Sequence, residues 1–247
     1  PLCVNLANAY KNMGRLREAE SFYRQAQYLD PDNLDGLIAW VRMEEARNNI
    51  DQAWSLLERV PETRREAPNV SLARAMLHRR GKNFDEALAE MDALIKRHPA
   101  SDQMPVFHYE RGDILDGMGL RLLEEHGVRV ALMTARRSAA AETRGRELRL
   151  SEVHVGVKDK RALLESLCTK YGHTTVEASM MGDDLVDLGA LTIAGLAVAP
   201  SSAHAWVKER VHWRTRAAGG EGAARELCDL ILGAQGKTEA VLAGFLR

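Results

Sequence analysis

The sequence predicts two architectures in succession: an array of α-helical repeats, followed by an α/β domain with a doubly wound parallel sheet. Two observations lead to this fold class. In the first half a small residue recurs every 34 positions, at Ala19, Ala53 and Ala87. In the second half short apolar runs alternate with amphipathic helical segments, as they do in parallel sheets. We predict domains over residues 1–118 and 119–247.

The 34-residue period is typical of paired helices in which each pair covers the apolar face of the pair before it. The recurring alanines let two helices approach closely, and Tyr10 and Tyr23 fill the space beside the first of them. The predicted helices form three pairs and one unpaired helix, near 5–27, 34–60, 69–97 and 105–118.

This period resembles that of the tetratricopeptide repeat. The first copy carries matching residues at the family's positions, namely Leu6, Tyr10, Gly14, Ala19, Tyr23, Ala26 and Pro31. The second copy is weak, and a fourth copy begins at "VFHYERGDILDGMG" but stops after one helix. The resemblance implies a concave groove that binds a peptide or a partner protein, although a role as a spacer fits the sequence equally well.

The second half opens with an apolar, β-branched run from Val128 to Thr134, which suits a strand buried on both faces. Ser138 is expected to cap the next helix, and Gly172 to close the helix "DKRALLESLCTKYG". The remaining strands are predicted at "EVHV", "VEASMMG", "GLAVA" and "HWRTR", and the remaining helices at "AHAWVKERV" and "EGAARELCDLILGAQ". In such sheets the binding site lies at the carboxyl ends of the strands.

Polar residues follow three of these strands. Thr134 ends the first, Lys160 follows "EVHV", and the string after "SMM" holds Asp183, Asp184 and Asp187. A hydroxyl, an ammonium group and several carboxylates at one edge of a sheet suit a phosphate and a divalent cation, and oxygen ligands favour Mg²⁺. Each feature also has a simpler interpretation, as a strand cap, a solvated lysine or an ordinary acidic turn.

The second half resembles the haloacid dehalogenase-like superfamily, and within it the 3-deoxy-D-manno-octulosonate 8-phosphate phosphatases. The matching strings are "DGMGLRLLEEHGVRVALMTARRS", "GVKDKRALLESL", "MGDDLVDL", "GLAVA" and "VKERVHWRTRAAGGEGAARELCDLILGAQGK". The resemblance covers residues 117–237 and implies hydrolysis of a sugar-acid phosphate in the synthesis of a lipopolysaccharide precursor. The roles it implies are catalysis for Thr134 and Lys160, Mg²⁺ binding for Asp183, Asp184 and Asp187, and substrate binding for Arg136.

The family's first motif, a strand followed by Asp-x-Asp, has no counterpart in this sequence. Its first aspartate attacks phosphorus and forms an aspartyl-phosphate. The aspartates with comparable spacing are Asp30, Asp32, Asp113 and Asp116, and all four belong to predicted helices or their ends. Smaller departures occur at Ala135 and Glu221, where the family has Gly and Arg, and in "APSSAH", which carries an insertion. The domain is therefore predicted to be an incomplete member of the superfamily.

We accordingly predict phosphatase activity close to background and weak Mg²⁺ binding, because fewer carboxylates face the ion. A second interpretation is an interaction protein, in which the repeats bind a partner and the second half is a folded platform. A third is an active phosphatase whose nucleophile comes from another chain. Because the missing strand is normally central, the sheet should have an open edge or a gap beside Val128 to Thr134, and the chain should tend to self-associate.

The composition also bears on possible partners and on the cellular compartment. Charged residues make up 28% and the net charge is −1, which gives no reason to expect a nucleic-acid partner. No apolar run approaches the roughly 18 residues of a membrane helix. Three widely separated cysteines, with no secretory signal predicted, favour reduced thiols in a cytoplasmic protein. The string "GMG" fits both halves, so the join is compatible with a gene fusion, a recombination product or an assembly artefact.

Overall fold

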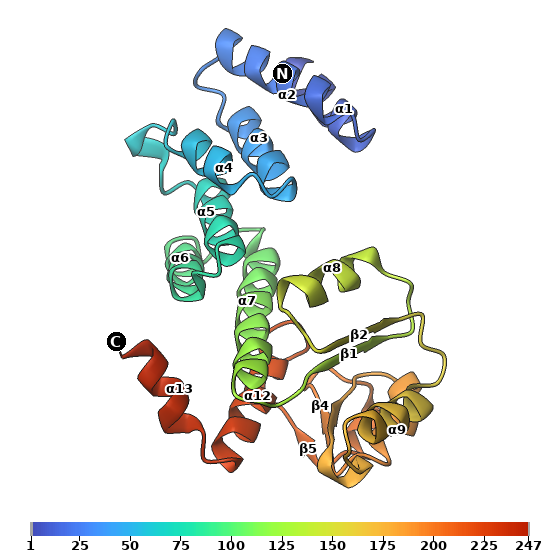
Figure 1. The fold of residues 1–247 in the computed structure, drawn as a ribbon. Coiled ribbons are helices and arrows are strands. Elements are labelled where there is room, and N and C mark those ends of the chain that lie inside the picture. The colour runs from blue at the N-terminus through green and yellow to red at the C-terminus, as the bar shows by residue number, and fades with distance from the viewer. Residues whose placement is uncertain (1, 247) are drawn as a thin grey trace. The chain divides into compact units, whose positions relative to one another are not determined.

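The computed structural model describes residues 2–246, and the chain divides into two compact units, of which one ends at His108 and the other begins at Tyr109 (Figure 1). The boundary lies inside helix α7 (Met104–Glu125), so the unpaired fourth-repeat helix continues into the segment "LRLLEE". The predicted domain boundary at residue 118 lies further along the same helix and stays a prediction. None of the helices in the described residues is both long and apolar enough to span a membrane.

The first unit is helical, as predicted. Its helices are α1 (Leu2–Asn12), α2 (Leu16–Leu29), α3 (Leu34–Ala46), α4 (Ile50–Leu57), the short 3₁₀ helix η1 (Glu62–Arg64), α5 (Pro68–Arg80) and α6 (Phe84–Arg97). The helices pair as α1 with α2, α3 with α4 and α5 with α6. These contacts confirm the three predicted pairs, and α7 is the predicted helix that follows them. No strand occurs between residues 2 and 118, as the repeat prediction requires.

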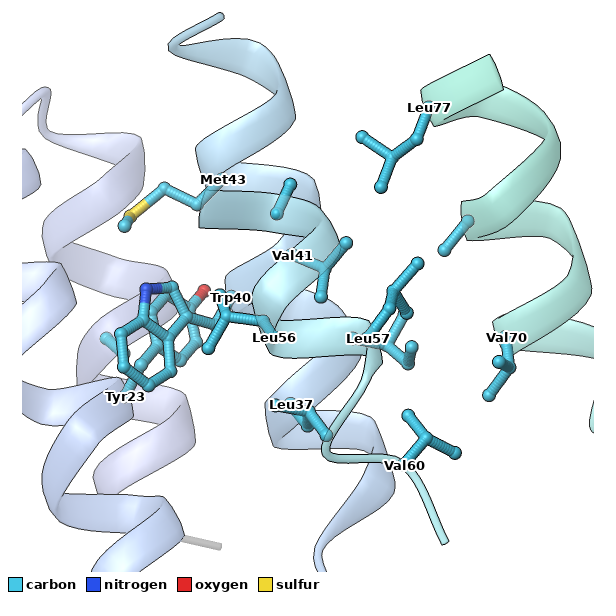
Figure 2. Packing of buried hydrophobic residues seen from close by; sticks show 14 of the residues in the cluster. Tyr23, Leu37, Trp40, Val41, Met43, Leu56, Leu57, Val60, Val70 and Leu77 are labelled. Atoms are coloured by element: carbon cyan, nitrogen blue, oxygen red, sulfur yellow. The ribbon is translucent and has the colours of Figure 1, made fainter. Parts of the chain in front are cut away.

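The 34-residue period is visible in the packing. Ala19, Ala53 and Ala87 are all fully buried, each in the second helix of its pair. The Tyr23 hydroxyl donates to Asn8 Oδ1 at 2.5 Å, and its ring stacks on that of Trp40 with 6.5 Å between centroids. Figure 2 shows these two rings at one end of the buried cluster, with residues of α5 at the other end. One continuous core therefore links successive helix pairs.

The turn inside each pair repeats with the same period. Gly14, Asn48 and Lys82 all have a positive φ, of 75°, 62° and 66°. Glycine reaches this left-handed region without steric cost, whereas a residue with a side chain does not. Lys82 therefore occupies a position whose backbone conformation favours glycine.

We expect Lys82→Gly to raise the free energy of unfolding by about 0.5–1 kcal/mol, because relief of the left-handed strain exceeds the entropy that a glycine loses on folding. Urea unfolding followed by circular dichroism measures the change. Lys96→Gly, at an exposed position in the last turn of α6, is the matched control and should lower stability by up to about 1 kcal/mol. A loss of stability in both variants would contradict this account of the turn.

The second unit contains two parallel sheets. In the first, β1 (Ala131–Thr134) pairs with β2 (Glu152–Val155). In the second, β4 (Leu196–Ala199) lies between β3 (Ser179–Met181) and β5 (Trp213–Arg214). The helices and 3₁₀ turns are α8 (Ala139–Glu147), α9 (Lys160–Lys170), η2 (Thr175–Glu177), η3 (Leu185–Asp187), α10 (Leu188–Leu191), α11 (Ala205–Lys208), α12 (Ala223–Ala234) and α13 (Thr238–Phe245). Every predicted strand and helix is present, and α13 is an addition.

The prediction that Val128 to Thr134 forms a strand buried on both faces was wrong. The strand begins at Ala131, and none of its four residues is buried. Val128 and Val130 pack instead on a cluster formed by α7 and α12. In β4, by contrast, Ala197, Val198 and Ala199 are 0–1% exposed. The residues of β1 are more exposed than those of β4 because β1 has one neighbouring strand whereas β4 has two. The unpaired side of β1 confirms the predicted open edge of the sheet.

Within the second unit, glycines let helix α7 approach its neighbours closely. A Cβ atom at Gly112 would lie 2.0 Å from the Gly220 carbonyl oxygen, and one at Gly119 would lie 3.0 Å from Cys228 Cβ. Near these glycines Asp116 Oδ1 accepts a hydrogen bond from the Arg225 backbone N–H at the start of α12. The segment of α7 that continues past the interrupted repeat is therefore an integral part of the second unit's core.

Candidate functional site

The acidic loop that follows β3 is held in place by backbone hydrogen bonds. The Gly182 N–H donates to the Val198 carbonyl of β4 at 3.1 Å, and the Asp183 carbonyl accepts from the His204 N–H at 2.9 Å. A Cβ atom at Gly182 would lie 2.5 Å from Asp187 Cβ, so only glycine fits at this point of the loop. The loop is thus fixed to β4 and to the segment that precedes α11.

Asp187 is the buried centre of this loop, with 2% of its surface exposed. Its Oδ2 accepts hydrogen bonds from the Asp183 and Asp184 backbone N–H groups at 3.0 and 3.2 Å. Its Oδ1 accepts a hydrogen bond from Lys160 Nζ, and the two side chains form a buried ion pair. Asp187 therefore closes the loop and pairs with the predicted catalytic lysine.

The Lys160–Asp187 pair joins the two sheets at their carboxyl ends. Lys160 is the first residue of α9, the helix after β2, whereas Asp187 lies in the loop after β3. The lysine side chain is 11% exposed, and the preceding Asp159 caps α9 by accepting from the Ala162 N–H at 2.9 Å. Met133 of β1 also packs against the core of the second sheet. Strand ends from both sheets therefore come together at this pair.

Asp183 and Asp184 differ from Asp187 because both are exposed. The Asp184 carboxylate accepts from the Leu185 N–H at 2.7 Å and so caps η3. Among residues 2–246 there is no group of three or more histidine, cysteine, aspartate or glutamate side chains that could hold a metal ion. The three aspartates share one loop without forming a three-carboxylate cluster, and their roles as ligands stay predictions.

Thr134 is tied to the segment that leads from β2 to Lys160. Its carbonyl accepts from the Val157 N–H at 3.0 Å, and its Oγ1 accepts from the Arg136 N–H at 3.2 Å. The Arg136 carbonyl in turn accepts from the Gly156 N–H at 3.1 Å, and the Arg136 side chain is exposed. Thr134 and Lys160 thus belong to the same end of the first sheet, and the catalytic role of each stays a prediction.

The aspartates of α7 have structural partners. Asp113 forms an ion pair with Arg144 at 3.0 Å. Asp116 receives the Arg225 N–H at 2.9 Å; burial raises the pKa of its carboxyl, and hydrogen bonds from the start of α12 oppose that rise. Asp30 and Asp32 lie at the exposed end of α2 and the turn after it, with no strand before them. None of the four lies at a strand end.

Two aromatic residues beside the acidic loop were missed by the sequence interpretation. His204 contributes the N–H that holds Asp183, and Trp206 lies two residues later at the start of α11. The stretch "APSSAH" was notable only for its insertion, and a tryptophan in a short amphipathic helix gives no signal of a site. Their relation to the loop depends on how β3 and β4 pair, which residue types alone do not reveal.

Comparison with known proteins assigns the two halves of the chain to two different families. Models of the tetratricopeptide repeat match residues 1–33 and 70–101. The 3-deoxy-D-manno-octulosonate 8-phosphate phosphatase of Yersinia pestis is 34% identical over 148 residues, which are 60% of this chain and 76% of the relative. The enzyme of Escherichia coli K12 is 32% identical over the same shares of the two chains.

Solved structures agree with this comparison. A hypothetical protein from Xanthomonas campestris is 53% identical, with a TM-score of 0.53 over 53% of this chain and 72% of its own. A 3-deoxy-D-manno-octulosonate 8-phosphate phosphatase from Moraxella catarrhalis, solved with magnesium, phosphate and KDO, is 36% identical, with a TM-score of 0.52 over 53% and 76%. A cobalt-bound homologue from Haemophilus influenzae is 32% identical, with a TM-score of 0.51 over 54% and 79%.

Proposed function

Because the chain belongs to the family of 3-deoxy-D-manno-octulosonate 8-phosphate phosphatases, we propose that its second unit binds a sugar-acid phosphate at the carboxyl ends of its strands and hydrolyses it at a rate close to background. The proposal rests on one observation: every aspartate of the second unit outside the acidic loop already has a hydrogen-bond or ion-pair partner. Asp113 pairs with Arg144, Asp116 binds the start of α12, Asp159 caps α9, and Asp229 pairs with Arg225.

The groups that support binding are those at the strand ends. The Thr134 hydroxyl would donate to a phosphate oxygen, and Lys160 would neutralise part of the phosphate charge. Lys160 is already paired with Asp187, which reduces the positive charge that it offers to a ligand. Without a carboxylate that attacks phosphorus, these groups bind and polarise the ester but do not cleave it. Phosphate release from the family's substrate, with Asp183→Asn as the comparison variant, tests the proposal.

Magnesium binding is proposed to be weak. Mg²⁺ requires six oxygen ligands in octahedral geometry and takes one or two carboxylates together with water and phosphate. The exposed Asp183 and Asp184 suit that role, but Asp187 is committed to Lys160 and to two backbone N–H groups. A bound cation would supply charge neutralisation for the phosphate. The homologues from Moraxella catarrhalis and Haemophilus influenzae hold magnesium and cobalt, which supports a divalent ion as the cofactor.

A second function, binding of a peptide or protein by the repeats, is favoured by the arrangement of the first helix of each pair. Helix α3 contacts both α1 and α5, so these three helices form one continuous surface. Arg42 is an exposed charged side chain of α3, so reversing its charge tests whether this helix takes part in binding. In this alternative the second unit is a folded platform.

If the repeats bind a partner, the full chain used as bait should retain a bound protein that Arg42→Glu loses, because reversing a charge on a binding surface weakens association. Quantitative mass spectrometry of captured proteins measures the difference. Trp206→Ala, which changes the second unit only, should retain the same partner. Equal capture by wild type and Arg42→Glu would count against binding through this surface.

A further inference from the structure

Trp206 presents a large exposed aromatic surface two residues after His204, whose backbone N–H donates to the acidic loop. Its side chain belongs to α11 and is 58% exposed. The ring of His204 meets the Trp206 ring edge-on, with 5.2 Å between centroids and 69° between planes. His204 Nδ1 also accepts from the Trp206 N–H at 3.2 Å. The histidine thus contacts both the backbone and the ring of an aromatic residue that contributes little to the core.

The same two residues are joined to the candidate phosphate site. The His204 N–H donates to the Asp183 carbonyl, and the Asp183 N–H donates to the buried Asp187. Asp183 is therefore held from both sides, by Asp187 within the loop and by His204 from the next connection. The aromatic pair is therefore linked to Asp183 through the backbone hydrogen bond of His204.

Other exposed apolar side chains border this unit. Leu185 and Val186, on the loop itself, are 41% and 60% exposed. Both follow Asp184 directly in the sequence, so the loop carries exposed apolar side chains as well as exposed carboxylates. With a divalent cation between the carboxylates and a phosphate, such a border suits a ligand with a phosphate at one end and a carbon skeleton with an apolar face, which is the character of a phosphorylated sugar acid. A bare phosphate ion would use the polar groups alone.

We propose that Trp206, positioned by His204, is the wall against which the carbon skeleton of the phosphate ester packs, while the phosphate lies toward Lys160 and Thr134. This assignment rests on the proposed binding function and adds a specificity-determining residue to it. Burial of an apolar face of the carbon skeleton against the ring is expected to strengthen binding roughly twofold to tenfold.

The experiment is a titration of the full chain, labelled with ¹⁵N at its tryptophans, with inorganic phosphate and separately with 3-deoxy-D-manno-octulosonate 8-phosphate, both in Mg²⁺ buffer. The chain has four tryptophans, and Trp206→Phe assigns the indole signal of interest. We expect this signal to shift with the sugar phosphate but not with inorganic phosphate. Trp206→Ala should weaken binding of the sugar phosphate about fivefold and leave phosphate binding unchanged, whereas Trp206→Phe should restore most of the affinity.

Tyr28→Ala is the matched control, because Tyr28 is an aromatic residue of the first unit that is 85% exposed. It should leave both affinities unchanged. Binding of the sugar phosphate without a shift at Trp206, or with equal affinity in Trp206→Ala, would overturn the assignment and leave the proposed binding function intact. Failure of both ligands to bind would overturn the two together.

Discussion

Phosphate release from 3-deoxy-D-manno-octulosonate 8-phosphate by the full chain is expected to stay within about tenfold of the uncatalysed rate, whereas enzymes commonly exceed that rate by about 10⁶-fold or more. The physical reason is that a loop aspartate, a lysine and a threonine can stabilise charge on the phosphate but do not supply the attacking carboxylate. A colorimetric phosphate assay in Mg²⁺ buffer, compared with the same buffer containing a chelator, measures the rate.

Asp183→Asn is the decisive comparison for this expectation. If release is at background, the substitution should change the rate by less than about twofold, because no catalysed step depends on Asp183. Turnover at an ordinary enzymatic rate that Asp183→Asn abolishes would refute the proposal. In that event Asp116→Asn and Asp113→Asn would show whether either aspartate of α7 acts as a surrogate nucleophile.

Asp187→Ala should be strongly destabilising, lowering the free energy of unfolding of the second unit by about 3–5 kcal/mol. The substitution leaves the Lys160 ammonium buried without its counter-charge and removes the acceptor of the Asp183 and Asp184 N–H groups. It also releases the link between the carboxyl ends of the two sheets. Urea unfolding followed by far-ultraviolet circular dichroism measures the loss.

Asp184→Ala is the control for this prediction, because it removes a carboxylate from the same loop at an exposed position. It gives up the side-chain capping of η3, including the hydrogen bond from the Leu185 N–H, and should cost about 1 kcal/mol. The double variant Lys160→Met/Asp187→Leu should recover part of the loss, since it removes both buried charges. Equal effects of Asp187→Ala and Asp184→Ala would show that the buried pair does not stabilise the unit.

The repeats could be predicted from the sequence because their packing is local. A period of 34 residues places Ala19, Ala53 and Ala87 at equivalent positions in successive helix pairs, and all three are fully buried. The same period recurs in the left-handed turns, but the sequence signals only the first of these with a glycine. Asn48 and Lys82 adopt the conformation because the helices on either side of each turn require it.

The candidate site could be predicted only in outline. The order of strands and polar residues places Thr134, Lys160 and the acidic loop at strand ends, since carboxyl ends of parallel strands lie together. Which aspartate turns inward could not be predicted. Asp187 is buried because Gly182 leaves room for it and Lys160 approaches from another element, and both conditions are tertiary. The contact of His204 with Asp183 depends likewise on strand pairing.

The division of the second unit into two sheets has a consequence for local unfolding. Strands β1 and β2 hold each other by a single ladder, whereas β4 shares one ladder with β3 and a second with β5. Two isolated strands are only marginally stable in water, and regions with few buried apolar contacts open at a lower free-energy cost than the rest of a domain. The amide hydrogens of β1 should therefore exchange with solvent through small, frequent openings, while those of β4 exchange through rarer and larger ones. Thr134 and Lys160 sit at the end of the weaker pair, so the residues predicted to meet the phosphate are carried by the part of the unit with the smaller opening free energy.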